Sequence, residues 1–248
     1  NGLDPTSVVY WKSIGSTALC PLSHSKFIPP SHWTPFGSFK LIRQTSSKTV
    51  RIKVDHYPNL QTEELLPRDV WVWKPQVYDK DREQHFPVIY MHDGQNLFFR
   101  ERSFANSTWG VAEAITRLSG WGFIEPAIIV GIDNTQNRYG DYLPTKPYET
   151  PEGKAFIANL KEATDTFEET SFVADQYLRL IVETIKPIID KNYRTRPTYK
   201  DTFTMGSSMG GLISLYALVE YPQIFGGAGC LSTHWPAVED FILPYLIT

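Results

Sequence analysis

Cysteine is scarce in this chain of 248 residues, which contains only Cys20 and Cys230. Two cysteines so far apart form no C-x-x-C pair and match no zinc-site spacing. Two separate thiols are the simpler interpretation, and a single long-range disulfide is the alternative. No glycine-rich phosphate-binding loop and no H-E-x-x-H pattern occurs in the sequence either. We therefore expect no metal and no cofactor.

The sequence also lacks long hydrophobic runs and any large excess of charge of one sign. No apolar stretch reaches the roughly 18 residues that a membrane-spanning helix needs. The net charge is −3, from 24 Lys and Arg against 27 Asp and Glu. We therefore expect neither nucleic acid nor a membrane as a partner. The chain begins at Asn1 and retains no signal-peptide pattern, which predicts a soluble product, either cytoplasmic or periplasmic or secreted after processing.

The residues that are present predict a folded globular protein. Hydrophobic residues make up 42%, charged residues 21% and aromatic residues 14% of the chain, as in ordinary compact domains. Residues 1–48 are irregular and rich in proline, with strand-like residues at 39–44, and we interpret them as an N-terminal extension. Residues 49–248 then form the main domain, which begins with a strand-like run at 49–54.

From residue 69 onward, apolar strand-like runs alternate with helical segments. The predicted strands are residues 69–73, 87–93, 126–133, 202–206 and 226–232. The predicted helices are 107–122, with Ser107 or Thr108 as its cap, 170–193 and 211–222. Strands that alternate with helices form a mostly parallel sheet flanked by helices. The predicted fold class is therefore α/β.

One serine lies between a predicted strand and a predicted helix, a position that suits a catalytic nucleophile. Gly206-Ser207-Ser208-Met209-Gly210 matches G-x-S-x-G, with Ser208 at its centre. The motif lies between an apolar strand and a helix, where the glycines let the two elements approach closely. The amides at the start of the helix favour an anionic intermediate. This context predicts Ser208 as a nucleophile and Ser207 as a structural turn residue.

A second motif, "YMHDGQNLF" at residues 90–98, follows an earlier strand. Sites in open α/β sheets form at the carboxyl ends of strands, so this loop should face Ser208. An acyl-transfer enzyme needs two hydrogen-bond donors where the carbonyl oxygen becomes negative. We expect the Met209 and Gln95 amides to supply them. His92 is expected to fix the loop rather than to act as the base.

Four stretches together resemble the putative-esterase family of α/β-hydrolases, which includes enterochelin esterases, esterase D and feruloyl and acetyl-xylan esterase-like enzymes. They are "PVIYMHDGQNLF", "VGIDNTQNRYGDYLP", "KPIIDKNYRTRP" and "FTMGSSMGGLISLYALVEYPQIFGGAGCLSTHW". The resemblance runs from about Val70 to the last residue and implies the α/β-hydrolase fold. It also implies that Ser208 is the nucleophile, that the 92–96 loop carries part of the oxyanion hole, and that the 138–142 loop lines the substrate cleft. The implied substrate-binding residues are Asp93, Gly94, Asn96, Arg138 and Trp235. For Arg138, a surface or structural ion pair is the alternative.

The sequence departs from this family in its last part. Family members place an acid and then a histidine on loops after later strands, but only 40 of the 248 residues follow Ser208. We expect the sheet to be incomplete at its C-terminal side, with the catalytic acid and histidine beyond Thr248. An unpaired sheet edge would favour association with another copy of the chain. His234 is expected in the pocket beside Trp235, and is the alternative candidate for the base.

These patterns leave three functional hypotheses. The first is a serine carboxylic ester hydrolase that forms an acyl-enzyme on Ser208 and acts on a small-molecule, sugar or phenolic ester. The second is an acyltransferase on the same scaffold. The third is a binding protein that keeps the fold without catalysis.

Overall fold

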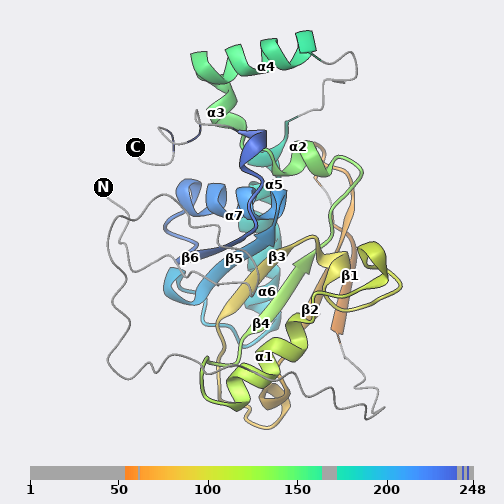
Figure 1. Cartoon of the computed structure of the whole chain (residues 1–248). Helices are drawn as coiled ribbons and strands as arrows, with labels where there is room; N and C mark the ends of the chain where they lie inside the picture. Colours follow the sequence, from red (N-terminus) through yellow and green to blue (C-terminus); the bar gives the residue numbers. More distant parts are fainter. Residues whose placement is uncertain (1–53, 61, 164–171, 239–241, 243–244, 246–248) are drawn as a thin grey trace, which may run out of the picture. The chain divides into compact units, whose positions relative to one another are not determined.

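The computed structural model describes residues 54–60, 62–163 and 172–238, together with Ile242 and Tyr245 (Figure 1). The predicted extension at 1–48 lies outside these residues, as do the strand-like run at 39–44, Cys20 and all but the last residue of the run at 49–54. The predicted boundary between extension and domain therefore stays a prediction.

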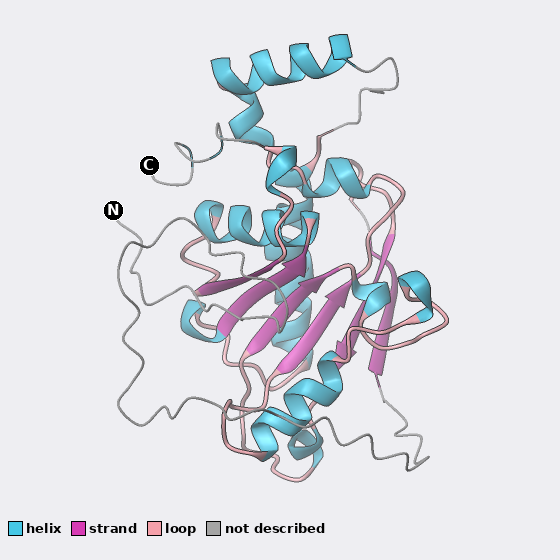
Figure 2. Ribbon diagram, in the orientation of Figure 1, coloured by secondary structure: helices cyan, strands magenta, loops and turns pink. Residues whose placement is uncertain are grey.

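Six strands of the described residues form one mixed sheet (Figures 1 and 2). In spatial order they are β1 (Val54–Leu60), β2 (Arg68–Trp73), β4 (Ile128–Ile132), β3 (Val88–His92), β5 (Thr202–Ser207) and β6 (Gly227–Leu231). β2 is antiparallel to both β1 and β4. Neighbours among β4, β3, β5 and β6 are parallel. The predicted α/β class with a mostly parallel sheet is confirmed.

The central strands are apolar because both faces of the sheet are covered. All five residues of β4 are buried, as expected of a parallel strand between two helical layers. One face carries α7 (Met209–Glu220) and the continuous segment of α5 (Ala174–Arg179), η5 (Leu180–Ile185) and α6 (Lys186–Asn192). The opposite face carries α1 (Val111–Gly120), and Figure 2 shows helices on both sides of the strands.

The remaining helical segments lie before, between or after these elements in the chain. They are η2 (Gln76–Asp79), η3 (Gly94–Asn96), η4 (Phe104–Asn106), α2 (Arg138–Tyr142), α3 (Thr145–Glu149), α4 (Pro151–Ala163), η6 (Tyr199–Asp201) and η7 (Trp235–Ala237). α3 and α4 pack against each other. Within the described part of the chain, no helix combines the length and the apolar character needed to cross a membrane.

Two helix predictions need correction. The helix predicted at 107–122 begins later, at Val111, and its N-cap is Gly110 with φ +65° rather than Ser107 or Thr108. The segment predicted as one helix at 170–193 includes a π-helical turn, η5. Its i→i+5 bonding shifts the helical period, and in the helix that follows, Ile189 is buried while its neighbour Ile188 is only half-buried.

Gly94 brings the loop after β3 directly against β4. A Cβ added at Gly94 would lie 2.7 Å from the carbonyl carbon of Gly131 and from the nitrogen of Ile132. These are backbone atoms of the neighbouring strand, so they cannot move aside as a flexible side chain can. A residue without a Cβ is therefore required at this position.

Gly94→Ala should lower the free energy of unfolding by about 2 kcal/mol or more, because the new methyl group must displace backbone. Gly120→Ala is the matched control: it lies in helix α1, and a Cβ there meets nothing within 4 Å. The control should leave stability unchanged or raise it slightly. Urea unfolding of both variants measures the difference, and equal stability of the two would contradict the packing described.

Candidate active site

Ser208 occupies the turn between β5 and α7. Its backbone angles are φ +60° and ψ −119°, a combination that residues with a side chain rarely adopt. Such strain persists only where the surrounding structure fixes it, and it often marks functional sites. The predicted position of Ser208 on a sharp strand-to-helix turn is confirmed.

Glycines on both sides make this turn possible. A Cβ on Gly206 would lie 2.5 Å from the carbonyl group of Gly210. A Cβ on Gly211 would lie 2.8 Å from Oγ1 of Thr233 in the loop after β6. The helix therefore starts in direct contact with the strand before it and with the next loop, as the G-x-S-x-G motif predicts.

The backbone of Ser208 is held by β6 and the loop that follows it. Its N–H donates to the Leu231 carbonyl at 2.9 Å, and its carbonyl accepts from the His234 N–H at 3.2 Å. Ser208 is the N-cap residue of α7, but its hydroxyl makes no capping hydrogen bond to the helix. Serine at an N-cap normally uses its oxygen in that way. The half-buried side chain is therefore not engaged in capping α7.

The loop after β3 begins with a second unusual backbone conformation. Asp93 has φ +58° and ψ +46° and precedes the short turn η3. Its carboxylate oxygen Oδ2 is 3.4 Å from the point where a Cβ on Gly210 would lie. The 92–96 loop thus packs against the first turn of α7, next to the turn that carries Ser208.

Three backbone amides at this junction lack an acceptor within their own helical turns. The first amides of an α-helix have no intrahelical partner, and Met209 is the first residue of α7. In η3 the Asn96 N–H donates to the Asp93 carbonyl at 2.9 Å, which leaves the Gly94 and Gln95 amides at the start of that turn. Of these three, the Met209 and Gln95 amides are the donors predicted for an oxyanion, and their role stays a prediction.

A network of polar side chains fixes the 92–96 loop. Arg138 in α2 donates from Nε and Nη2 to the two oxygens of Asp93, at 2.7 and 2.8 Å. Asn134, just after β4, donates its side-chain amide to Asp93 at 2.7 Å. The backbone N–H of Asn134 donates to the Gln95 side chain at 3.2 Å, and the Tyr142 hydroxyl accepts from the Asp93 N–H at 3.1 Å.

His92 is completely buried under this loop. Its Nδ1 hydrogen bonds with the Tyr177 hydroxyl at 2.7 Å and its Nε2 with the Thr204 hydroxyl at 3.1 Å. Burial lowers the pKa of His92 to about 4, so the ring is neutral near pH 7. Both ring nitrogens are engaged in the core, which supports a structural role, as expected.

His234 differs from the other histidines that the structure describes. His56 bonds to the Asp69 carboxylate, and His85 bonds to the Glu83 carbonyl. The side chain of His234 is exposed in the loop after β6, beside the half-buried Trp235. Its backbone contacts the Ser208 turn, so the fold brings His234 to the edge where Ser208 lies.

Two more buried aspartates lie at this edge of the sheet. Asp141 in α2 pairs with Arg68 at 3.1 Å, with side-chain exposures of 2% and 0%. Asp133, directly after β4, pairs with Arg102 and accepts from the Trp71 indole at 3.3 Å. Burial raises the pKa of Asp133 to about 6, while the positive charge of Arg102 opposes the rise.

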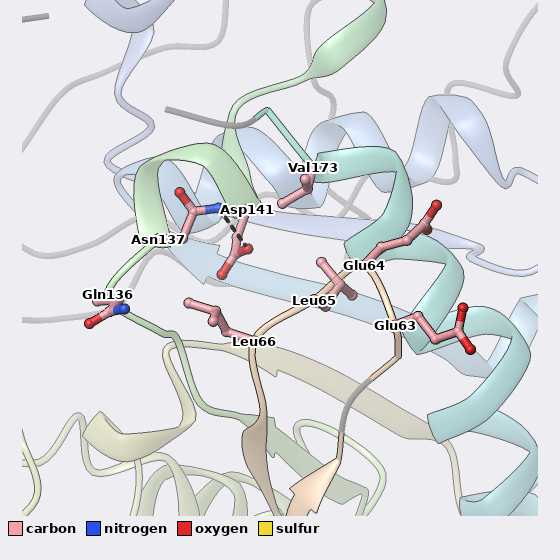
Figure 3. A pocket seen from close by; sticks show the side chains of 8 residues that line it. All are labelled: Glu63, Glu64, Leu65, Leu66, Gln136, Asn137, Asp141 and Val173. Carbon is pink, nitrogen blue, oxygen red and sulfur yellow. Dashed lines mark hydrogen bonds between the residues drawn. The ribbon is translucent and has the colours of Figure 1, made fainter. Parts of the chain in front are cut away.

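An open pocket of about 450 Å³ lies on the side of α2 that carries Asp141 (Figure 3). It is lined by Glu63, Glu64, Leu65, Leu66, Gln136, Asn137, Asp141 and Val173. Neither Ser208 nor the 92–96 loop lines it, so this pocket is separate from the candidate catalytic junction. In the described ranges, no cluster of three or more His, Cys, Asp or Glu side chains is placed to hold a metal ion.

Asn134 and Tyr142 both hold the 92–96 loop, and neither was among the predicted site residues. Asn134 follows β4 at the edge where parallel strands present functional residues, and that position was the available signal. Tyr142 carried no comparable signal, because an aromatic residue in a loop most often belongs to the core.

A family model described as Putative esterase matches residues 66–242. The chain belongs to the Putative esterase family. The resemblance noted in the sequence is thereby confirmed, and this family membership supports ester hydrolysis as the general activity.

This Putative esterase chain is similar at low identity to one curated relative and to several solved structures. The uncharacterized protein YbbA of Bacillus subtilis is 26% identical over 151 residues, which cover 60% of this chain and 51% of YbbA. The IroE-like serine hydrolase of Shewanella oneidensis matches with a TM-score of 0.56 and 22% identity, over 78% of this chain and 55% of the hydrolase. The enterobactin esterase FES of Shigella flexneri matches with a TM-score of 0.51 and 19% identity, over 75% and 38% of the two chains. The chain thus spans about half or less of the length of these relatives.

The buried His92 predicts how stability depends on pH. Its pKa is about 4 in the folded protein and 6.5 when unperturbed, so acid protonates the unfolded chain first. Wild-type protein should therefore lose roughly 3 kcal/mol of unfolding free energy from this group as the pH falls from about 6.5 to 4. His92→Gln should be less stable overall but lack this part of the decline.

Urea unfolding at a series of pH values measures both curves. Asp133 has a raised pKa and contributes in the opposite direction between about pH 4 and 6, but it does so in both proteins. The comparison therefore rests on the difference in slope. Parallel curves for wild type and His92→Gln would show that His92 does not titrate as described.

Proposed function

We propose that the protein is a serine carboxylic ester hydrolase that works through an acyl-enzyme on Ser208. The observation that carries this proposal is the turn itself: Ser208 adopts a strained backbone conformation at the N-cap of α7, yet its hydroxyl does not cap the helix. A serine that served only as an N-cap would use its hydroxyl oxygen in a hydrogen bond to the helix, and it would need no strained backbone. Membership in the Putative esterase family supports the same reading.

The proposed reaction has two halves. Ser208 Oγ attacks the ester carbonyl as a base takes its proton, and the carbonyl oxygen becomes an anion. The Met209 and Gln95 amides are the proposed donors to that anion. Collapse of the tetrahedral intermediate breaks the carbon–oxygen bond to the alcohol, which leaves with a proton. Water then attacks the acyl-enzyme, releases the carboxylic acid and restores Ser208.

The base is proposed by elimination among the described histidines. His56, His85 and His92 have ring nitrogens bonded elsewhere, whereas His234 lies in the loop whose backbone contacts Ser208. His234 is therefore the candidate within the described residues. A histidine on further polypeptide, as the family resemblance implies, is the alternative.

The substrate is proposed to be a small-molecule, sugar or phenolic ester. The chain covers about half of YbbA and of the Shewanella oneidensis hydrolase, so the substrate of the whole protein is itself a proposal. Asp93, Gly94, Asn96, Arg138 and Trp235 stay predictions as substrate-binding residues. The first four belong to the 92–96 loop or contact it, and Trp235 follows β6 at the same edge.

Ser208→Ala should lower the turnover of an activated aryl ester by about 10⁴-fold or more in the natural protein, because no other group can form the acyl-enzyme. Ser207→Ala is the matched control, because Ser207 is the last residue of β5 and is half-buried like Ser208. It should keep most of the activity. Turnover of a chromogenic ester measures both variants.

Covalent labelling adds an independent measurement. A fluorophosphonate probe should add one adduct to the peptide that contains Ser208, and the Ser208→Ala variant should remain unlabelled. Comparable hydrolysis by wild type and Ser208→Ala would end the proposal. If labelling occurs but added alcohols capture the acyl group in preference to water, the protein is an acyltransferase instead.

A further inference from the structure

The carboxylate of Asp93 lies where a negative charge should be harmful to the proposed reaction. Asp93 precedes the Gly94 and Gln95 amides, and its Oδ2 is 3.4 Å from the Cβ position of Gly210, one residue after Met209. The side chain is only 3% exposed, so water does little to screen it. A full negative charge next to the first turn of α7 and to the start of η3 would repel the oxyanion.

Arg138 forms a bidentate ion pair with this carboxylate, which is the geometry that neutralises its charge most effectively. Its Nε and Nη2 donate to the two oxygens of Asp93 at 2.7 and 2.8 Å, which is the paired arrangement that makes arginine–carboxylate contacts strong. The guanidinium also lies 5.2 Å from the centre of the Tyr142 ring, whose hydroxyl accepts from the Asp93 N–H. Arg138 is thus attached both to the charge and to the loop.

The same contacts fix where the donor amides point. Asp93 holds a left-handed backbone conformation, and the next residues begin η3. Asn134 ties Asp93 and Gln95 together, since its side chain donates to Asp93 and its backbone N–H donates to the Gln95 side chain. The ion pair and the Asn134 contacts therefore hold the 92–96 loop against the first turn of α7.

We propose that Arg138 is a positioning residue that acts through Asp93: it cancels the charge of the Asp93 carboxylate and holds the loop so that its amides can stabilise the oxyanion. This inference rests on the proposed function. It differs from the role that the family resemblance implies for Arg138, which is direct contact with the substrate. Two of the guanidinium nitrogens are engaged by Asp93, and this engagement favours the indirect role.

The two roles predict different kinetics. An Arg138 that binds substrate directly would, when removed, raise KM. An Arg138 that cancels the charge of Asp93 would, when removed, lower kcat, because the oxyanion forms only in the transition state. One uncompensated charge near the oxyanion, with an effective dielectric constant of about 20, corresponds to a loss of about 10- to 100-fold in kcat.

The test measures kcat and KM for an activated aryl ester in the natural protein. Arg138→Met should lose about 10- to 100-fold in kcat, with KM within about 3-fold of wild type. Asp93→Asn/Arg138→Met should recover most of that loss, because the charge that needed cancelling is gone and Asn134 still holds the loop through its contact with the Gln95 side chain. Arg138→Lys should lose less than Arg138→Met, since lysine keeps the charge but not the paired geometry.

Arg102→Met is the matched control. Arg102 also pairs with a buried aspartate at the end of a neighbouring strand, with side-chain exposures of 31% for Arg102 and 9% for Asp133. Arg138 is 33% exposed, and so comparable. Removal of Arg102 should leave kcat within about 3-fold of wild type. A loss equal to that of Arg138→Met would show that any broken Arg–Asp pair at this edge has the same effect, which overturns the inference.

Two further outcomes would overturn it: an effect of Arg138→Met on KM alone, or a double variant no more active than Arg138→Met. If Arg138→Met does not fold, Asp93→Asn is compared with the double variant. Removal of Arg138 in the Asp93→Asn background should then lower kcat by less than about 3-fold. Fluorophosphonate labelling of Ser208 in each variant separates the two hypotheses. If the wild type is labelled and either contrary result is found, the role of Arg138 is rejected. If the wild type is neither labelled nor active, the proposed function is rejected, and this inference is rejected with it.

Discussion

The close approach of β5 and α7 is the constraint on which the rest of the site depends. Gly206 and Gly210 have their backbones in contact, at a distance that leaves no room for a Cβ on Gly206. This contact forces Ser208 into a backbone conformation that a side chain disfavours, and it aims the first amides of α7 at the carboxyl edge of the sheet. The loop after β3 then packs on the same helical turn. The proposed nucleophile and the proposed donors are brought together by backbone packing.

The carboxyl edge of the sheet concentrates buried charge. Three aspartates there are each paired with an arginine: Asp93 with Arg138, Asp141 with Arg68 and Asp133 with Arg102. Replacing such pairs by apolar residues is often neutral or stabilising, so stability alone does not account for three of them. Each pair joins segments distant in sequence and ties the loops at this edge to one another. We interpret the pairs as the means by which long loops are given one conformation.

Much of the fold could be predicted from local patterns, whereas the contacts within the site could not. The apolar runs that became β3 and β4 are continuous and bounded by polar residues, and together with the strand predicted at 202–206 they predicted a parallel sheet correctly. The G-x-S-x-G motif predicted the turn at Ser208, because its glycines have a purely local steric purpose. The partner of Asp93 was undetermined, because Arg138 lies 45 positions away and an arginine in a loop carries no mark of what it contacts. The π-helical turn was missed because one extra residue in a helical turn leaves no compositional trace.

The attachment of Ser208 to β6 uses only main-chain atoms. Its N–H and carbonyl bond to the backbone of Leu231 and His234, so the identity of those two side chains does not enter the bonds that hold the turn. Substitutions at these two positions can therefore accumulate during evolution without altering the backbone of the Ser208 turn. The position of the proposed nucleophile is in this way inherited separately from the side chains beside it, including that of the proposed base, His234.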